Sequence, residues 1–257
     1  MDKNLAQNNL ISVIIATKNG GRFLARSIDS IEKQSEKNFE VIIISDGSTD
    51  DTVSIAKKLA ETRSFIKIVD LEKNIGPGLA RNLAVKEAHG QYIVLLDDDD
   101  EWLDKNKIEI QKKFLIENPD YVLVGADLTE FVSEDGKPLS VFKPKKDDGS
   151  IRSRILIYNQ FITSSVMFRK NAFEKVGGFA DMRLAEDYDL WLRLAQQGKV
   201  ANLSGCKTRY YKRLSGAALT NRKKLNKIVL ELVKKYGQNF PHSYIAKLVA
   251  YLRIAKS

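Results

Sequence analysis

Apolar runs alternate with segments of helical periodicity along the first hundred residues. The runs are rich in Ile and Val, are apolar at consecutive positions, and cover residues 10–16, 39–45, 65–71 and 92–97. Such runs are typical of strands that are buried on both faces. After the first run, apolar residues recur at helical spacing at Phe23, Leu24, Ile28 and Ile31, which predicts a helix. Strand and helix alternating in this way predict an α/β fold, in which helices cover both faces of a parallel sheet.

The second part of the chain follows a different pattern. Residues 121–168 predict further strands of mixed direction, with a turn at 134–137 and a short helix near 151–158. We expect one helix to begin near Leu103, after the acid run, and another at Asp187. Apolar residues recur at helical spacing after Asp187. The mixed strands therefore form a second half of the same α/β unit.

Polar residues gather where the predicted strands end. Thr17 closes the first strand, Asp46 closes the second, and a run of four aspartates and a glutamate, residues 97–101, follows the fourth. In open α/β sheets, ligands bind at the carboxyl ends of the strands. The sequence therefore predicts a ligand site at this edge of the sheet.

The acid run can hold a divalent cation, repel anions, or cap the helix that follows. Capping requires one aspartate rather than four. Mg²⁺ and Mn²⁺ are commonly held by one or two carboxylates together with substrate phosphates, and a cation offsets the repulsion of crowded acids. Because the run follows a buried parallel strand, we favour a divalent-cation site. The Gly76-Pro77-Gly78 segment is not a dinucleotide fingerprint, because Arg81 stands where a third Gly or Ala belongs.

The net charge of +9 is divided unevenly. Residues 207–257 contain thirteen Lys and Arg and one acid, Glu231, and carry +12, whereas the first 206 residues sum to −3. Cys206 is the single cysteine, which excludes an internal disulfide and fits a reducing compartment. The N-terminal residues lack the pattern of a signal peptide, and the first apolar run is too short to span a bilayer. We therefore expect a cytoplasmic protein.

Five segments together resemble the family 2 glycosyltransferases of GT-A fold. They occur in the family's order from about Leu10 to Gly198, and read SVIIATKN, EVIIISDGSTDDT, NIGPGLARN, GQYIVLLDDDDEW and VGGFADMRLAEDYDLWLRLAQQG. The resemblance implies a nucleotide-sugar donor, usually UDP-linked, a divalent cation (Mn²⁺ or Mg²⁺), and transfer with inversion at the anomeric carbon. It implies a catalytic domain over residues 1–215, with a donor half to about residue 100 and an acceptor half after it, followed by basic helices over 216–257.

The resemblance also assigns roles to single residues. The family's DxD motif falls on Asp97 and Asp99, its uracil-reading acid falls on Asp46, and Asp99 resembles the aspartate that touches the metal. Asp97 is the second metal ligand that this motif implies. The residues implied to bind the nucleotide-sugar are Thr17, Asp46, Arg81, Asn82, Asp97 and Asp98.

The family's catalytic acid pair falls on Glu186 and Asp187. An attacking hydroxyl must lose its proton as the new bond forms, so a carboxylate is needed as base. Taken alone, the two acids also suit the cap and first turn of a helix. With the resemblance, we expect Asp187 to be the base and Glu186 to help hold the acceptor.

One departure from the family lies after this helix. Many relatives carry a histidine where this chain has Leu214 in YYKRLSGAALT. Lys212 or Arg213 can contact the diphosphate in its place. His89 and His242 lie elsewhere and fit ordinary surface or partly buried positions. The sequence therefore does not identify the residue that takes the place of this histidine at the metal site.

Nothing in residues 121–168 names the acceptor. Trp102 and Trp191 can stack on a sugar, although lone tryptophans are commonly core residues. The tail predicts two amphipathic helices, one with Leu232 and Val233 on its apolar stripe and one with Leu248.

These stripes either pack on the catalytic domain or a second subunit, or contact an anionic membrane surface through the basic tail. Nucleic acid is disfavoured as a partner, because no aromatic and basic platform accompanies the charge.

The sequence leaves two candidate functions. The first is a glycosyltransferase that acts on a glycan or glycolipid acceptor in surface polysaccharide, capsule or glycolipid synthesis, as a peripheral protein on the inner face of the membrane if the tail binds lipid. The second is an inactive nucleotide-sugar-binding or scaffold protein of the same fold.

Overall fold

A seven-stranded sheet forms the centre of the molecule in the computed structural model, which describes residues 9–213 and 221–257. Its strand order is β10-β6-β9-β4-β1-β2-β3. Four parallel neighbours come from the first hundred residues, namely β1 (Ile11–Thr17), β2 (Phe39–Asp46), β3 (Ile66–Leu71) and β4 (Tyr92–Leu95). β1 pairs in parallel with both β2 and β4, and β2 pairs in parallel with β3. The α/β fold predicted from the apolar runs is confirmed.

The other half of this sheet is mixed, as the sequence predicts. Its strands are β6 (Tyr121–Ala126), β9 (Met167–Arg169) and β10 (Lys199–Leu203). β9 runs antiparallel to β4 on one side and to β6 on the other, whereas β10 runs parallel to β6. β9 therefore joins the two halves of the chain into one sheet.

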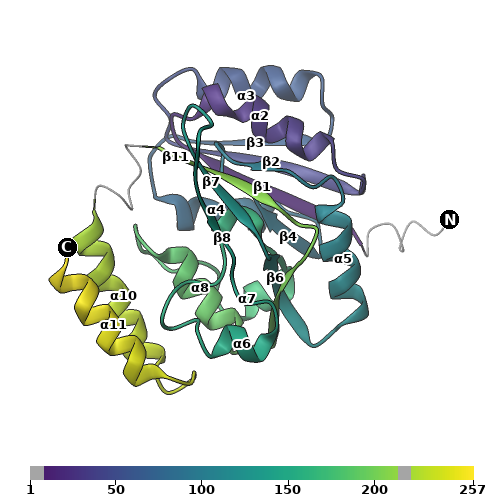
Figure 1. Ribbon diagram of the computed structural model, residues 1–257. Coiled ribbons are helices and arrows are strands. Elements are labelled where there is room, and N and C mark those ends of the chain that lie inside the picture. The colour runs from purple at the N-terminus through teal and green to yellow at the C-terminus, as the bar shows by residue number, and fades with distance from the viewer. Residues whose placement is uncertain (1–8, 214–220) are drawn as a thin grey trace.

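Helices cover both faces of the sheet because alternate residues of the buried strands point in opposite directions. In β1, Ile14 belongs to one core, whereas Val13 and Ile15 belong to the other. The Val13 core is closed by α2 (Gly21–Glu32), α3 (Thr52–Glu61) and α5 (Lys107–Glu117). The Ile14 core is closed chiefly by α4 (Pro77–Glu87), α7 (Lys170–Lys175) and α8 (Glu186–Leu194). Figure 1 shows α2 and α3 on one side of the sheet and α7 and α8 on the other.

A second, four-stranded sheet has the order β5-β11-β7-β8. It consists of β5 (Glu101–Trp102), β7 (Thr129–Ser133), β8 (Pro138–Phe142) and β11 (Thr208–Lys212). The turn predicted at 134–137 connects β7 to β8, which pair antiparallel. β5 pairs antiparallel with β11. Its strand β5 begins at Glu101, the last residue of the acid run, and the sheet forms part of the site described below.

Two predicted helix positions are wrong. The helix expected from Leu103 begins at Lys107, because the residues after the acid run first form β5 against β11. The helix expected near 151–158 is instead α6 (Asp148–Arg152). It begins earlier because the side chain of Asp147 caps it, accepting the backbone N–H of Ser150 at 2.9 Å. A short 3₁₀ helix, η1 (Thr163–Ser165), precedes β9.

The tail forms the two helices predicted, α10 (Arg222–Tyr236) and α11 (Ser243–Ala255). They lie side by side at one edge of the molecule (Figure 1). Leu232, Val233 and Tyr236 of α10 belong to the Ile14 core, and the Tyr236 hydroxyl donates to Asp189 of α8 at 2.8 Å. α10 is thus packed on α8 and the Ile14 core. The predicted domain boundary at residue 215 lies outside the described residues. No helix within the described ranges is both long and apolar enough to cross a membrane.

Candidate active site

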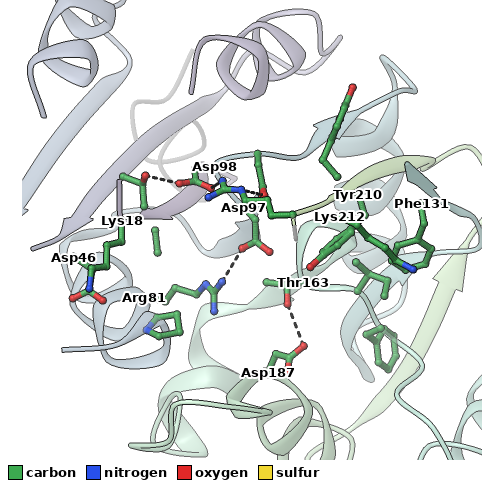
Figure 2. Close-up of a pocket in the computed structure, with 18 of the residues that line it drawn as sticks. Lys18, Asp46, Arg81, Asp97, Asp98, Phe131, Thr163, Asp187, Tyr210 and Lys212 are labelled. Carbon is green, nitrogen blue, oxygen red and sulfur yellow. Dashed lines mark hydrogen bonds and ion pairs between the residues drawn. The ribbon is translucent and has the colours of Figure 1, made fainter. Parts of the chain in front are cut away.

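A cavity of about 640 Å³ opens at the carboxyl ends of β1, β2 and β4, a volume that suits a small-molecule ligand. Figure 2 shows side chains from both sheets and from α4 and α8 converging on it. Of the nine residues predicted from the sequence, seven line the cavity, namely Thr17, Asp46, Arg81, Asp97, Asp98, Asp99 and Asp187. Asn82 and Glu186 do not line it. Residues more than 160 positions apart in the chain therefore meet in one space.

The four aspartates of the acid run have different surroundings. Asp98 is buried and accepts a hydrogen bond from the Thr17 hydroxyl at 2.5 Å. Asp100 is fully buried, where it accepts the Ser164 hydroxyl and, at 3.0 Å, the backbone N–H of Tyr211. Asp100 therefore ties the loop to the second sheet, while the three aspartates before it face the cavity.

Two arginines lie among these acids. Arg81 of α4 pairs with Asp97 at 2.7 Å and with Glu186 at 3.1 Å. Arg213, which follows β11, pairs with Asp98 and with Asp99, each at 2.5 Å. Each guanidinium thus bridges two carboxylates that would otherwise repel each other. Together the four acids and two arginines leave a formal excess of two negative charges.

This negative excess favours the binding of a cation. Burial, and then the charge of Asp98, raises the pKa of Asp99 to about 7, so Arg213 compensates its carboxylate only in part. Within the described residues, no group of three or more His, Cys, Asp or Glu is arranged to hold a metal alone. Asp97 and Asp99 offer the hard oxygen ligands that Mg²⁺ and Mn²⁺ prefer, and two carboxylates suffice when substrate phosphates complete the shell. The chemistry of the donor set therefore fits a divalent cation bound with a phosphorylated ligand.

Asp46 has a structural contact as well as a place in the cavity. Its two carboxylate oxygens accept the backbone N–H groups of Ile75 at 2.7 Å and Gly76 at 2.9 Å. It therefore holds the start of α4 against the end of β2. Each oxygen keeps a second lone pair for a ligand.

Asn82 and Glu186 support other residues instead of facing the cavity. The Asn82 amide donates to the Phe179 carbonyl and accepts the Phe179 N–H, both at 2.8 Å. Glu186 holds Arg81, whose guanidinium also lies 5.6 Å from the Phe179 ring centroid. The ARN segment and the acid pair thus form one clamp that aims Arg81 at Asp97. Binding of the nucleotide-sugar by Asn82 and of the acceptor by Glu186 stays a prediction.

Asp187 lies at the start of α8, with a carboxylate that faces the cavity. Its Oδ2 accepts hydrogen bonds from Thr163 at 3.2 Å and Asn159 at 3.5 Å. Burial, and then the charge of Glu186, raises the pKa of Asp187 to about 6. Ala185, two positions earlier, has a left-handed φ of 60°, and such strained residues concentrate at functional sites. A carboxylate with this pKa accepts a proton more readily than an exposed aspartate does.

The far side of the cavity is aromatic and comes from the second sheet and the segment before η1. Phe131 of β7 and Tyr210 of β11 have ring centroids 5.2 Å apart, and the Lys212 ammonium lies 4.9 Å from the Phe131 ring. Ile162 and Asn159 complete this lining. We call these five residues the aromatic end, and call Thr17, Asp46, Asp97, Asp99 and Arg213 the charged end.

Sequence reasoning assigned no role to Phe131, Tyr210, Asn159 or Thr163. Aromatic residues in a strand read as ordinary core, and the polar residues at and before the start of η1 carry no motif. Thr163 and Asn159 contact Asp187 from the segment around η1, whereas Phe131 and Tyr210 reach the cavity from the second sheet.

The remaining candidates fall outside the cavity. Trp102 and Trp191 are buried core residues, with 4% and 0% of their surface exposed. The side chain of His89 is 72% exposed and pairs with Glu40, and His242 is also exposed. Leu214, where many relatives have histidine, lies outside the described residues.

Comparison with known proteins identifies the family. The family model for glycosyl transferase family 2 matches residues 12–177. The chain is 34% identical over 211 residues to an uncharacterized glycosyltransferase of Rickettsia felis, covering 79% of this chain and 33% of that protein. It is 29% identical over 208 residues to TuaG of Bacillus subtilis, a putative teichuronic acid biosynthesis glycosyltransferase, covering 78% of each. This chain belongs to glycosyl transferase family 2, and it spans about a third of the length of its relatives from Rickettsia felis, Rickettsia bellii and Rickettsia conorii.

Solved structures agree on the fold. Residues 1–349 of S. aureus TarS in complex with UDP-GlcNAc match with a TM-score of 0.66 and 20% identity, over 96% of this chain and 70% of that chain. The mannosyltransferase PcManGT from Pyrobaculum calidifontis, in complex with GDP-Man and Mn²⁺, matches with a TM-score of 0.70 and 18% identity, over 96% and 74%. At these identities the likeness shows the fold alone, which is the GT-A fold predicted from the sequence.

Proposed function

We propose that this chain transfers a sugar from a UDP-linked donor to an acceptor hydroxyl, with inversion, in the synthesis of a surface polysaccharide or glycolipid. The observation that carries the proposal is that one cavity joins the acid run at the strand ends to the carboxylate of Asp187. The charged end suits a diphosphate with its cation, and the aromatic end suits a sugar acceptor. TuaG, a relative of similar length, supports a role in polysaccharide synthesis.

The donor contacts follow from the positions of Asp46 and Arg213. Asp46 lies at the end of β2 with lone pairs free for a nucleobase N–H, which uracil presents at N3. Structures of this fold hold both UDP-linked and GDP-linked sugars, so the fold does not choose between them. A carboxylate that accepts one N–H favours uracil. Arg213 lies beside the acid run, where its guanidinium can also pair with a phosphate oxygen.

Asp97 and Asp99 would hold the divalent cation, which, when bound, offsets the negative charge that builds on the diphosphate as it leaves. Arg213 lies against Asp99, and its guanidinium, which has several N–H donors, could pair with the donor phosphates as well as with that carboxylate. Arg81, held by Glu186, keeps Asp97 oriented throughout.

Asp187 acts as the base. The acceptor hydroxyl approaches from the aromatic end and donates its proton to the carboxylate as its oxygen attacks the anomeric carbon. Thr163 and Asn159 hold that carboxylate in place. The attack comes from the side opposite the leaving diphosphate, so the configuration at that carbon inverts.

A thermal-shift panel of UDP, GDP and CMP, each with and without Mn²⁺, tests the donor assignment. We expect UDP with Mn²⁺ to give the largest shift in melting temperature. A ligand present at a hundred times its dissociation constant adds about 2.7 kcal/mol to the free energy of unfolding, which such a panel detects. Asp99→Ala should keep the fold and lose the Mn²⁺ dependence of UDP binding. A larger shift with GDP overturns the uracil assignment, and an unchanged Mn²⁺ dependence in the variant overturns the ligand role of Asp99.

UDP release from UDP-sugars, measured with and without a panel of glycoside acceptors, tests the transferase itself. Release that requires an acceptor, with a product of inverted configuration by NMR, supports the proposal. UDP-sugar binding with no release under any acceptor favours the inactive nucleotide-sugar-binding or scaffold protein instead.

A further inference from the structure

The outer face of α11 is apolar and exposed. It consists of Tyr244, Ile245, Leu248, Tyr251 and Leu252, whose exposed fractions are 79%, 46%, 51%, 54% and 52%. At 100° per residue these five side chains fall within one stripe about 120° wide. Elsewhere in the described ranges, large exposed apolar residues occur singly or in pairs. A contiguous apolar patch on a soluble domain marks an interaction site.

The opposite face of α11 packs on the protein through small residues. Ala246 and Ala250 are buried, with 1% and 2% of their surface exposed, and lie on the side away from the stripe. Arg253 fixes the rotation of the helix, since its backbone carbonyl accepts Asn226 of α10 at 3.1 Å and its guanidinium donates to the Ile157 carbonyl at 2.9 Å. The outer face therefore cannot turn inward without breaking these contacts.

The charges around the outer face are almost all positive. Residues 221–257 contain nine Lys and Arg and one acid, Glu231. Lys247 and Lys256 are exposed and border the stripe on its two sides. Lys223, Lys224 and Lys227 extend the positive surface along α10.

We propose that the outer face of α11 docks on an anionic lipid surface. Apolar residues with bordering lysines are the pattern of a helix that lies in the plane of the membrane interface, and tyrosines favour that depth because they are apolar with a polar tip. A second copy of the chain is the less favourable occupant, because its tail would bring the same positive charge against this one. A helix of thirteen residues lies on the surface without crossing it.

Sedimentation with vesicles tests the proposal on the full chain. We expect binding to vesicles of phosphatidylcholine and phosphatidylglycerol, little binding to phosphatidylcholine alone, and a loss of binding in high salt because screening shortens the reach of the charges. Lys247→Glu with Lys256→Glu should weaken binding by at least about 25-fold, at roughly fivefold for each lysine lost. Leu248→Ser with Leu252→Ser should weaken it by about tenfold or more.

Two matched controls are available. Leu139→Ser with Val141→Ser removes an apolar pair from β8 with 53% and 54% exposure, and Lys57→Glu with Lys58→Glu makes the same charge change on α3. Both should bind vesicles as the wild type does, and all four variants should keep the wild-type circular dichroism because their side chains are exposed. Controls that weaken binding as much as the α11 variants overturn the proposal. The proposal is also overturned if the wild type binds no vesicles and sedimentation equilibrium shows a dimer that the Leu248→Ser with Leu252→Ser variant no longer forms.

Discussion

The charged end and the aromatic end of the cavity are built in different ways. The charged end combines Thr17, at the carboxyl end of β1, with Arg213, which follows β11, and both contact Asp98 at 2.5 Å. The aromatic end comes from the second sheet and the segment before η1, and its Phe131 and Tyr210 lie opposite each other in the pairing of β7 with β11, with ring centroids 5.2 Å apart. In the proposed function, the charged end recognises the charge of the donor and the aromatic end recognises the shape of the acceptor.

This difference separates two demands on the enzyme. UDP-linked donors share a diphosphate, so the end proposed to bind it can be a rigid network of acids and arginines. Acceptors vary in shape, and aromatic surfaces accept varied sugars with little directional constraint. Asp187 stands between the two ends, held by Thr163 and Asn159. Variants at each end should therefore change different steps.

Asp187→Asn should give the largest effect, at the junction of the two ends. Asparagine has nearly the same shape and can still accept the Tyr188 N–H that Asp187 accepts at 2.7 Å, so the fold should survive. It cannot take a proton, and general-base assistance is worth about a hundred- to ten-thousandfold. We expect the transfer rate to fall by at least about a hundredfold. A near wild-type rate would assign the base elsewhere, with Glu186 the first alternative.

Arg213→Ala should weaken UDP binding while leaving the acceptor KM unchanged. A hydrogen bond to a charged group contributes about 1.5–3 kcal/mol, so the loss should be roughly ten- to hundredfold. Without nucleotide, Mn²⁺ should bind more tightly to this variant, because Asp98 and Asp99 lose their competing cation. Calorimetry with UDP and electron paramagnetic resonance with Mn²⁺ measure the two effects.

Arg209→Ala is the control for this variant. Arg209 lies on the same strand, β11, but pairs with Glu101 and Glu130 outside the cavity. The Arg209→Ala variant should bind UDP with the wild-type affinity. An Arg213→Ala variant with wild-type UDP affinity and weaker Mn²⁺ binding would contradict the role of Arg213 at the charged end.

The rate should rise with pH through the pKa of Asp187. As base, the residue acts in its deprotonated form, and burial raises its pKa to about 6. kcat/KM should therefore increase between pH 5 and 7 and then level off, with a value at pH 5 about tenfold below the plateau. The residual rate of Asp187→Asn should lack this step. A wild-type kcat/KM that does not change between pH 5 and 7 would contradict the role of Asp187 as the base.

Tyr210→Ala should give the smallest effect, and it tests whether the aromatic end contributes to acceptor binding without contributing to UDP binding. Aromatic contacts contribute about 0.5–1.5 kcal/mol, so the acceptor KM should rise by roughly three- to tenfold, while the UDP affinity stays at the wild-type value. Tyr251→Ala, at an exposed tyrosine of α11, serves as the control. If Tyr210→Ala instead weakens UDP binding as strongly as Arg213→Ala, the two ends are not separate.

The sequence predicted the charged end better than the aromatic end, for physical reasons. Strands buried on both faces have a strong apolar signature, and acids directly after them fall at one sheet edge by topology alone. Asp46 and Asp97 could therefore be placed from the strand pattern, whereas Asp187 follows no predicted strand and was assigned only through the resemblance to the family. The contacts of Phe131 and Tyr210 depend on the parallel pairing of β7 with β11, strands that lie far apart in the chain and carry no local signal of it.

The tail illustrates the same limit. Helical periodicity predicted α10 and α11, but not which face of each packs. α10 buries its large residues, Leu232 and Val233, whereas α11 buries Ala246 and Ala250 and exposes Leu248. Alanines pack inward there because the close approach of two helices leaves room only for small side chains. The position of the partner helix decides this, and periodicity does not report it.

Titration of UDP, with Mn²⁺ present, into Asp187→Asn and the wild type tests the separation of binding from catalysis most directly. The donor contacts that we propose are those of Asp46, Asp97, Asp99 and Arg213, and none of these residues contacts Asp187 in the hydrogen bonds or ion pairs of the described residues. We expect UDP dissociation constants that agree within about twofold, although the transfer rates differ by at least about a hundredfold. A dissociation constant that rises in step with the loss of rate, in a variant that keeps its fold, would contradict it.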